Sequence, residues 1–190
     1  MILFSVFISF VVLQRLMELV IAKRNEKNMK LRGAIEYGKE HYHYIVLLHI
    51  GFLFCFITEA IWSGFTLTPF FTVLFTLYVL LQAVRIWTIR SLGMYWNTKI
   101  IILPKAMVVK RGPYRYLRHP NYVIVALEIL IIPLLFSAYF TAVLFSLLNY
   151  FLLTYIRIPA EEKALTAQSN YGDDFAKTPK FVPRPINKNR

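Results

Sequence analysis

The stretch YIVLLHIGFLFCFITEAIW, from Tyr44 to Trp62, is almost entirely apolar. A helix needs roughly 20 mainly apolar residues to cross the hydrocarbon core of a bilayer, and this stretch has about that length. Further stretches of the same character lie at residues 2–22, 70–89, 122–136 and 139–156. We therefore predict an all-α, integral membrane helix bundle of about five transmembrane helices.

The composition of the whole chain supports this class. The 190 residues are 57% hydrophobic and 16% aromatic, and the mean hydropathy is +0.52, which is too apolar for an ordinary soluble domain. No repeat, linker or low-complexity tract divides the chain, so we expect a single membrane-embedded domain over residues 1–190. Residues 122–136 form a short span that ends near Pro133, and we expect a tight helical hairpin with residues 139–156.

The positions of the basic residues predict the orientation. Almost all of the 22 Lys and Arg residues lie after the first span, after the third span or in the C-terminal tail. Because Lys and Arg are retained on the cytoplasmic side, these segments should be cytosolic, in what we take to be a bacterial plasma membrane with the C-terminus inside. Topology and anionic membrane lipids account for the net charge of +12, so no nucleic-acid partner is expected.

Cysteine and histidine usage argues against disulfide and metal chemistry. Cys55 is the only cysteine, and it lies within a predicted span. His41 and His43, in the segment GAIEYGKEHYHY, are two residues apart, which does not match the spacing of zinc ligands on a helix. We expect no metal, and we interpret this segment as an interfacial strip that closes the mouth of a pocket.

The densest polar chemistry lies in RGPYRYLRHPNY, residues 111–122. Pro120 disfavours helical backbone at the preceding residue and suits the start of a helix, so Arg118 and His119 should lie at the lip of the fourth span. A helix N-terminus offers free N–H groups and partial positive charge, which suit a carboxylate or phosphate. We favour a binding site for His119 and Tyr122, whereas a lipid phosphate explains Arg115 more simply.

A second polar cluster, RIPAEE, runs from Arg157 to Glu162 at the exit of the fifth span. Its adjacent carboxylates, Glu161 and Glu162, can accept hydrogen bonds from amines or ribose hydroxyls, or face a sulfonium cation. The alternative is an ordinary first turn of a helix, where acidic side chains complement the dipole. We expect Pro159 to start that helix, since proline is tolerated in a first turn.

The run VVKRGPYRYLRHPNY, followed by YIRIPAEEKAL and YGDDF, resembles the isoprenylcysteine carboxyl methyltransferase family of membrane enzymes. The resemblance implies that residues 91–121 and 157–183 enclose S-adenosylmethionine on the cytosolic side, while a lipophilic acceptor enters from the bilayer. The cofactor-binding residues that it implies are Gly112, Tyr114, Arg118, His119, Tyr122 and Glu162. Arg157 and Glu161 would face the reacting groups, with Arg157 as the partner of an anionic acceptor.

Two ionisable residues inside predicted spans, Glu128 and His49, bear on the identity of the acceptor. Such residues are costly in lipid unless they are paired or functional. Glu128 could be a structural partner of Arg85 and His49 a satisfied buried histidine, or both could line the acceptor cavity and deprotonate a phenol or enol. A carboxylate acceptor would need no base. We predict O-methylation of a lipophilic acid, enol or phenol, with a preference for the hydroxyl.

Two other functions fit parts of the pattern. Membrane sterol reductases have a similar RHPNY element and bind NADPH, although those chains are longer. A lipid-binding protein without enzymatic activity would use the cytosolic arginines to bind headgroups. Binding of S-adenosylhomocysteine but not of NADPH would distinguish the methyltransferase from both.

Overall fold

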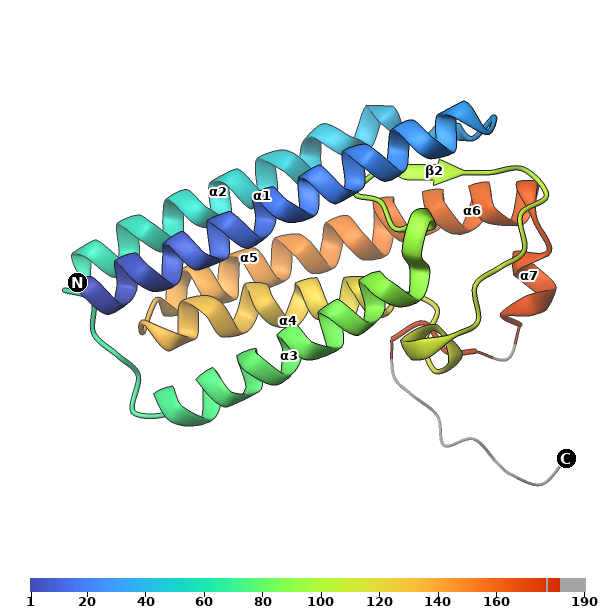
Figure 1. Ribbon diagram of the computed structural model, residues 1–190. Helices are drawn as coiled ribbons and strands as arrows, with labels where there is room; N and C mark the ends of the chain where they lie inside the picture. Colours follow the sequence, from blue (N-terminus) through green and yellow to red (C-terminus); the bar gives the residue numbers. More distant parts are fainter. Residues whose placement is uncertain (177, 182–190) are drawn as a thin grey trace, which may run out of the picture.

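The computed structural model describes residues 1–176 and 178–181. Its principal helices lie side by side along one direction (Figure 1): α1 (Ile2–Leu31), α2 (Lys39–Trp62), α3 (Phe71–Leu92), α4 (Pro120–Leu135) and α5 (Tyr139–Phe151). Within the described residues, four helices are long and apolar enough to cross a membrane: Ile2–Leu31, Lys39–Trp62, Phe71–Tyr95 and Tyr139–Gln168. The fourth predicted span is a shorter apolar helix, α4. The predicted all-α membrane bundle is confirmed, and the protein is a multi-pass integral membrane protein.

Apolar side chains cover the outside of the bundle as well as its core. Leu47, Phe54 and Val79 are 61%, 70% and 51% exposed, although all three are large and hydrophobic. Water would disfavour so large an apolar surface, whereas lipid does not. The backbone stays helical through these stretches because no water is available in a bilayer to satisfy a free N–H or C=O group.

Aromatic packing fixes one end of the bundle. Phe4 of α1 lies 5.0 Å from Phe136 and 5.4 Å from Phe56 of α2, measured between ring centroids, and both pairs are arranged edge to face. Phe136 ends α4, so this contact joins α1, α2 and the α4–α5 turn. Edge-to-face aromatic pairs add about 0.5–1.5 kcal/mol to the burial of the rings.

The turn between α4 and α5 forms the predicted hairpin, and a residue of α2 caps its second helix. The first turn of α5 contains no acidic residue. The carboxylate of Glu59 accepts hydrogen bonds from the backbone N–H groups of Phe140 and Thr141, at 2.9 and 2.8 Å, and from the Thr141 hydroxyl at 2.6 Å. Free N–H groups at a helix start carry partial positive charge, so a carboxylate there stabilises the helix.

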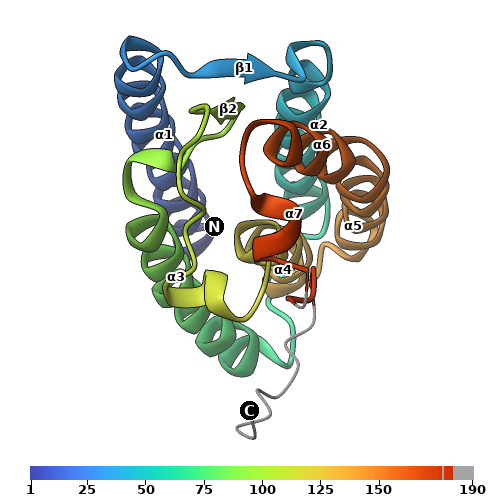
Figure 2. The ribbon, with the colours of Figure 1, turned by 90° about the vertical axis from the view of Figure 1, so that its right-hand side faces the viewer.

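The opposite end of the bundle carries a small antiparallel sheet, and we call it the sheet end. The strand β1 (Ile35–Tyr37) pairs with β2 (Ile100–Ile102), with Ile35 opposite Ile102. Figure 2 shows β1 bridging the ends of α1 and α2. We did not predict these strands, because three residues are too few to show a strand periodicity. The segment that we interpreted as interfacial is therefore partly a strand.

The helix α6 (Ile158–Gln168) has Pro159 in its first turn, as we predicted. However, no break separates it from the fifth span, because α5 continues into α6 through a π-helical segment, η3 (Leu152–Arg157). Proline lacks an N–H group and clashes with the carbonyl four residues earlier in a regular α-helix. The wider π turn before Pro159 changes the hydrogen-bond spacing there, so the helix passes the proline without ending.

Candidate functional site

A cavity lies at the sheet end, between the loop after α3, the start of α4, and the helices α6 and α7 (Tyr171–Asp174). Its wall contains five residues that the sequence analysis assigned to a site, which are Tyr114, Arg118, His119, Tyr122 and Glu161. These residues meet because α4 begins, and α5 continues into α6, at the same end of the bundle (Figure 2). The fold thus joins the two polar clusters of the sequence.

The start of α4 places His119 at the centre of this site. The helix begins at Pro120, as predicted, and His119 precedes it with a non-helical backbone (φ −126°, ψ 57°). The His119 side chain is buried, and its ring stacks on that of Tyr122 with 5.4 Å between centroids. Its Nε2 lies 3.1 Å from a carboxylate oxygen of Glu162 and 3.5 Å from the hydroxyl of Tyr171. His119 therefore connects α4, α6 and α7.

Glu162, the partner of His119, is not among the described residues that line the cavity. It also accepts a hydrogen bond of 2.6 Å from Lys180, and Arg118 lies 3.6 Å away. The hydrogen-bond donors His119 and Lys180 and the nearby Arg118 favour the ionised form of the Glu162 carboxylate.

A second set of contacts joins Tyr122, Glu161 and Arg157. The hydroxyl of Tyr122 donates a hydrogen bond to Glu161 and accepts one of 3.1 Å from Nε of Arg157. Arg157 is 4% exposed, and its Nη2 donates to the carbonyl oxygen of Thr98 at 2.9 Å. Its Nη1 is buried, with no hydrogen-bond partner in the described part of the chain. Arg157 is not among the described residues of the cavity wall, and one nitrogen of its buried guanidinium lacks a hydrogen-bond partner in the described part of the chain.

Two more predicted residues, Tyr114 and Arg118, lie in the cavity wall. Tyr114 is contributed by the short helix η2 (Gly112–Arg115), and burial raises the pKa of its phenol, as it does for Tyr171 in α7. Arg118 anchors the segment after α7: its Nε donates to the carbonyl of Thr178 at 2.6 Å, and its backbone N–H donates to Pro179 at 3.0 Å. Both residues therefore help to close the cavity.

Gly112, which we expected to contact the cofactor, packs against α3. Among the described residues, it does not belong to the cavity wall. Its backbone φ is +59°, and a Cβ atom added there would lie 2.0 Å from Oγ of Ser91. Only glycine permits both the positive φ and this close approach of η2 to α3. The structure therefore shows a packing role for Gly112, and its contact with the cofactor stays a prediction.

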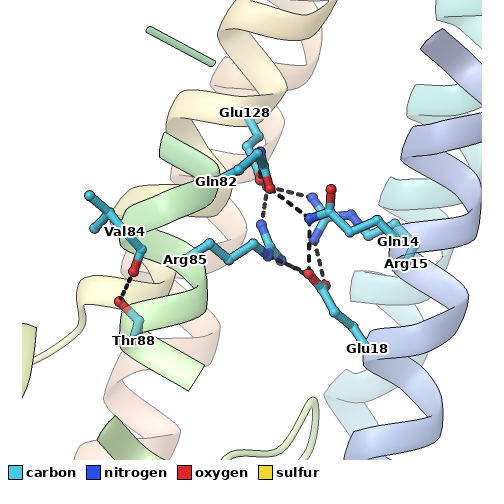
Figure 3. A network of polar contacts seen from close by, with 8 residues as sticks. All are labelled: Gln14, Arg15, Glu18, Gln82, Val84, Arg85, Thr88 and Glu128. Atoms are coloured by element: carbon cyan, nitrogen blue, oxygen red, sulfur yellow. Dashed lines mark hydrogen bonds and ion pairs between the residues drawn. The ribbon is translucent and has the colours of Figure 1, made fainter. Parts of the chain in front are cut away.

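Glu128 pairs with arginine, as the structural alternative for this residue predicted. It is 1% exposed, and its carboxylate forms ion pairs with Arg85 of α3 and, at 2.5 Å, with Arg15 of α1 (Figure 3). Both arginines also contact Glu18, and Gln82 donates to Glu128 at 2.9 Å. Two arginines and two glutamates thus form a cluster with balanced charge, in which Arg15 is half-buried and the other three are buried, and which joins α1, α3 and α4.

His49 is likewise not among the described residues that line the cavity. Its Nδ1 is 2.8 Å from the carbonyl oxygen of Ile45, one turn earlier in α2. With a proton on Nδ1, this contact satisfies the ring within its own helix. The two residues that we expected to act as bases, His49 and Glu128, thus have partners of their own outside the cavity.

The sequence analysis did not identify several residues of the site and of the charged cluster. Arg15 and Glu18 stand inside the first apolar span, and an ionisable residue in a span is itself a signal of pairing or function. Trp96, Asn121 and Tyr171 line the cavity. Asn121 and Tyr171 belong to the quoted segments RHPNY and YGDDF, and Trp96 lies in residues 91–121, but nothing in the sequence distinguishes the three from their neighbours. The described residues contain no group of three or more His, Cys, Asp or Glu side chains that could hold a metal ion.

Comparison with known proteins assigns these helices to a family. Residues 71–167 match the isoprenylcysteine carboxyl methyltransferase family. The chain is 43% identical over 166 residues to an uncharacterized protein, YpbQ, of Bacillus subtilis (strain 168), which covers 87% of this chain and 98% of that protein. It is 31% identical over 153 residues to an uncharacterized protein of Haemophilus influenzae, covering 80% of this chain and 88% of that protein.

The family match covers α3, α4, α5 and nearly all of α6, which include the start of α4 and the Arg157–Glu162 segment at the cavity. Membership supports a membrane methyltransferase, and methyltransferases of this family generally use S-adenosylmethionine. The resemblance recognised in the two polar motifs is confirmed. The chain belongs to the isoprenylcysteine carboxyl methyltransferase family.

Proposed function

We propose that the protein transfers a methyl group from S-adenosylmethionine to an oxygen atom of a lipophilic acceptor at the membrane surface. The observation that carries this proposal is the contact set of Tyr122, Glu161 and Arg157. It combines Glu161, a carboxylate of the cavity wall, with the buried guanidinium of Arg157, which is not among the described residues of the wall but contacts Tyr122 of the wall. A cationic methyl donor and an anionic acceptor can both find a partner there.

The residues of the cavity fit the cofactor. S-adenosylmethionine, when bound, supplies a methyl group on a positively charged sulfur. The carboxylate of Glu161 and the aromatic faces of Tyr114 and Tyr122 favour a cation nearby. His119 and Glu162 hold the start of α4 against α6, so their contact sets the width of the cavity. Arg118, in the cavity wall, can pair with the carboxylate of the amino-acid end.

Arg157 is the residue that we propose binds the acceptor. Its Nη1 has no partner in the described structure, and an unpaired polar group of a buried cation is costly. An ionised oxygen that binds Nη1 removes this cost and is held in a fixed position. Methyl transfer is an in-line displacement, so holding the oxygen in line with the methyl group and excluding water provides most of the catalysis.

The surroundings of Glu128 and His49 change the acceptor that we favour. Our preference for a hydroxyl acceptor rested on these two residues as bases, and neither lies in the described part of the cavity wall. The guanidinium of Arg157 instead suits an oxygen that is already ionised when it binds. We therefore favour a carboxylic acid or an acidic enol over a phenol, whose proton would have to be removed in the site.

The proposal also sets the orientation in the membrane. S-adenosylmethionine is polar and soluble, so the sheet end has to face the cytosol of the cell, which we take to be bacterial. The basic residues of the loops favour the same orientation. The C-terminus then lies in the cytosol.

Calorimetric titration of the detergent-purified protein tests the cofactor. We expect S-adenosylhomocysteine, the product of methyl transfer, to bind, and NADPH to give no heat of binding. Binding of NADPH alone would favour a reductase, and binding of neither would favour a lipid-binding protein. Either result would contradict the proposed function.

A further inference from the structure

Two neutral polar residues, Trp96 and Asn121, line the cavity and take no part in the contacts described above. Trp96 follows the short helix η1 (Gly93–Tyr95) and is 3% exposed. Its backbone is fixed, because its carbonyl accepts a hydrogen bond of 2.7 Å from Asn25 of α1. Its indole Nε1 is buried and has no hydrogen-bond partner among residues 1–176 and 178–181.

Asn121 is the second residue of α4, between Pro120 and Tyr122. Its Oδ1 is also buried without a hydrogen-bond partner in the described part of the chain. Leaving a polar atom buried and unpaired is unfavourable, and most such atoms in native proteins have partners. Both residues line the same cavity, so we look for a ligand there that pairs with both of these atoms.

The pair has a definite chemical character. An indole N–H can only donate a hydrogen bond, and an amide oxygen can only accept one. Neither group is charged, so a charged ligand group would gain less here than beside Arg118, His119 and Glu161. The apolar strand β2 (Ile100–Ile102) lines the same cavity. A flat, neutral ring that carries a donor and an acceptor on its edge fits these surroundings.

We propose that Trp96 and Asn121 bind the adenine base of the cofactor and select it over other bases. Trp96 Nε1 donates a hydrogen bond to a ring nitrogen, and Asn121 Oδ1 accepts one from the exocyclic amino group. This inference rests on the proposed function and adds a specificity site to it. The charged residues at the start of α4 are then left for the amino-acid end of the cofactor.

Titration of the full-length, detergent-purified protein with two ligands tests this site. S-adenosylhomocysteine carries the amino group, whereas S-inosylhomocysteine carries a carbonyl oxygen in its place. The wild-type protein should bind the inosine compound about 2- to 12-fold more weakly, which corresponds to one neutral hydrogen bond. Trp96→Phe and Asn121→Ala should each weaken S-adenosylhomocysteine binding by a similar factor.

The variants also make a prediction about selectivity. Asn121→Ala should reduce the preference for the adenine compound, because it removes the group that reads the amino position. Matched controls are Trp62→Phe, at a residue that is 89% exposed, and Asn28→Ala, at an exposed position of α1. Both controls should bind as the wild type does.

Equal wild-type affinity for the two compounds would overturn the inference, even if Trp96→Phe failed to fold. Unchanged S-adenosylhomocysteine affinity in both cavity variants would overturn it as well. In these cases the wild-type protein still binds S-adenosylhomocysteine, and the proposed function stands. If the wild-type protein does not bind S-adenosylhomocysteine at all, the proposed function fails, and this inference fails with it.

Discussion

At the scale of single residues, His119 and Glu162 make the contact that ties α4 to α6. We expect His119→Ala and Glu162→Ala each to weaken S-adenosylhomocysteine binding by roughly 1.5–3 kcal/mol, since each removes a hydrogen bond to a charged group. Calorimetric titration of the purified variants measures this change. Arg115→Ala, at an exposed residue outside the described cavity wall, is the matched control. Unchanged affinity in both variants would show that this contact does not shape the cofactor site.

Arg157 and Glu128 are both buried and charged, but we expect different consequences from their replacement. Arg157→Ala should lower kcat/KM for an ionised acceptor by at least about 30-fold, because truncating one member of a buried charge pair costs about 2–5 kcal/mol. Glu128→Gln should instead lower stability by about 3–5 kcal/mol, because Arg15 and Arg85 lose a charged partner.

Methylation rates and unfolding midpoints of the two variants, in the same detergent, separate these effects. The protein that remains folded after Glu128→Gln should methylate at the wild-type rate. A stable Glu128→Gln variant that binds S-adenosylhomocysteine but has lost its activity would make Glu128 a base after all.

At the scale of secondary-structure elements, α5 depends on a cap from another helix. Glu59 of α2 satisfies backbone N–H groups at the start of α5. We expect Glu59→Ala to lower stability by about 0.5–2 kcal/mol, the usual loss for a helix cap. Thermal unfolding in detergent measures the change. Thr58→Ala is the control, at the exposed residue that precedes Glu59 in α2. Equal midpoints for the two variants would contradict the capping role.

The elements differ in how far their sequence determines them. The apolar stretches predicted the helices, because lipid requires a continuous run of apolar residues with its backbone satisfied internally. Pro120 predicted the start of α4 correctly. Pro159 lies in the first turn of α6, as predicted, but it did not reveal that the preceding π segment joins α6 to α5 without a break. The strands β1 and β2 depend on contacts between distant segments, which no local pattern records.

The same difference between local sequence patterns and contacts of distant segments explains which parts of the site could be predicted. The motifs around His119 and Glu161 were recognisable because their polar residues are concentrated between apolar stretches. The packing role of Gly112 was not predicted, because its requirement for glycine comes from Ser91 in α3 and cannot be read from its neighbours in the chain. Arg15 became meaningful only when the fold brought it to Glu128. The motifs could therefore be recognised in the sequence, but the contacts between helices could not be predicted from it.

At the scale of the whole molecule, the account requires the sheet end to face the cytosol. We expect a cysteine at Thr66, in the connection between α2 and α3, to react with a membrane-impermeant maleimide on intact cells. A cysteine at Lys27, near the sheet end of α1, should react only after the membrane is permeabilised. Both positions are exposed. The reverse pattern would place the cavity outside the cell, away from the cytosolic cofactor.

The most direct test of the central claim is to follow the methyl group itself. A lipid extract is incubated with the purified protein and S-adenosylmethionine that carries a deuterated methyl group, and the products are analysed by mass spectrometry. The account predicts a lipophilic product that has gained one labelled methyl group on oxygen, and that is lost with Arg157→Ala. A labelled methyl group on carbon, nitrogen or sulfur, or no labelled product from extracts of the protein's own host cells, would contradict it.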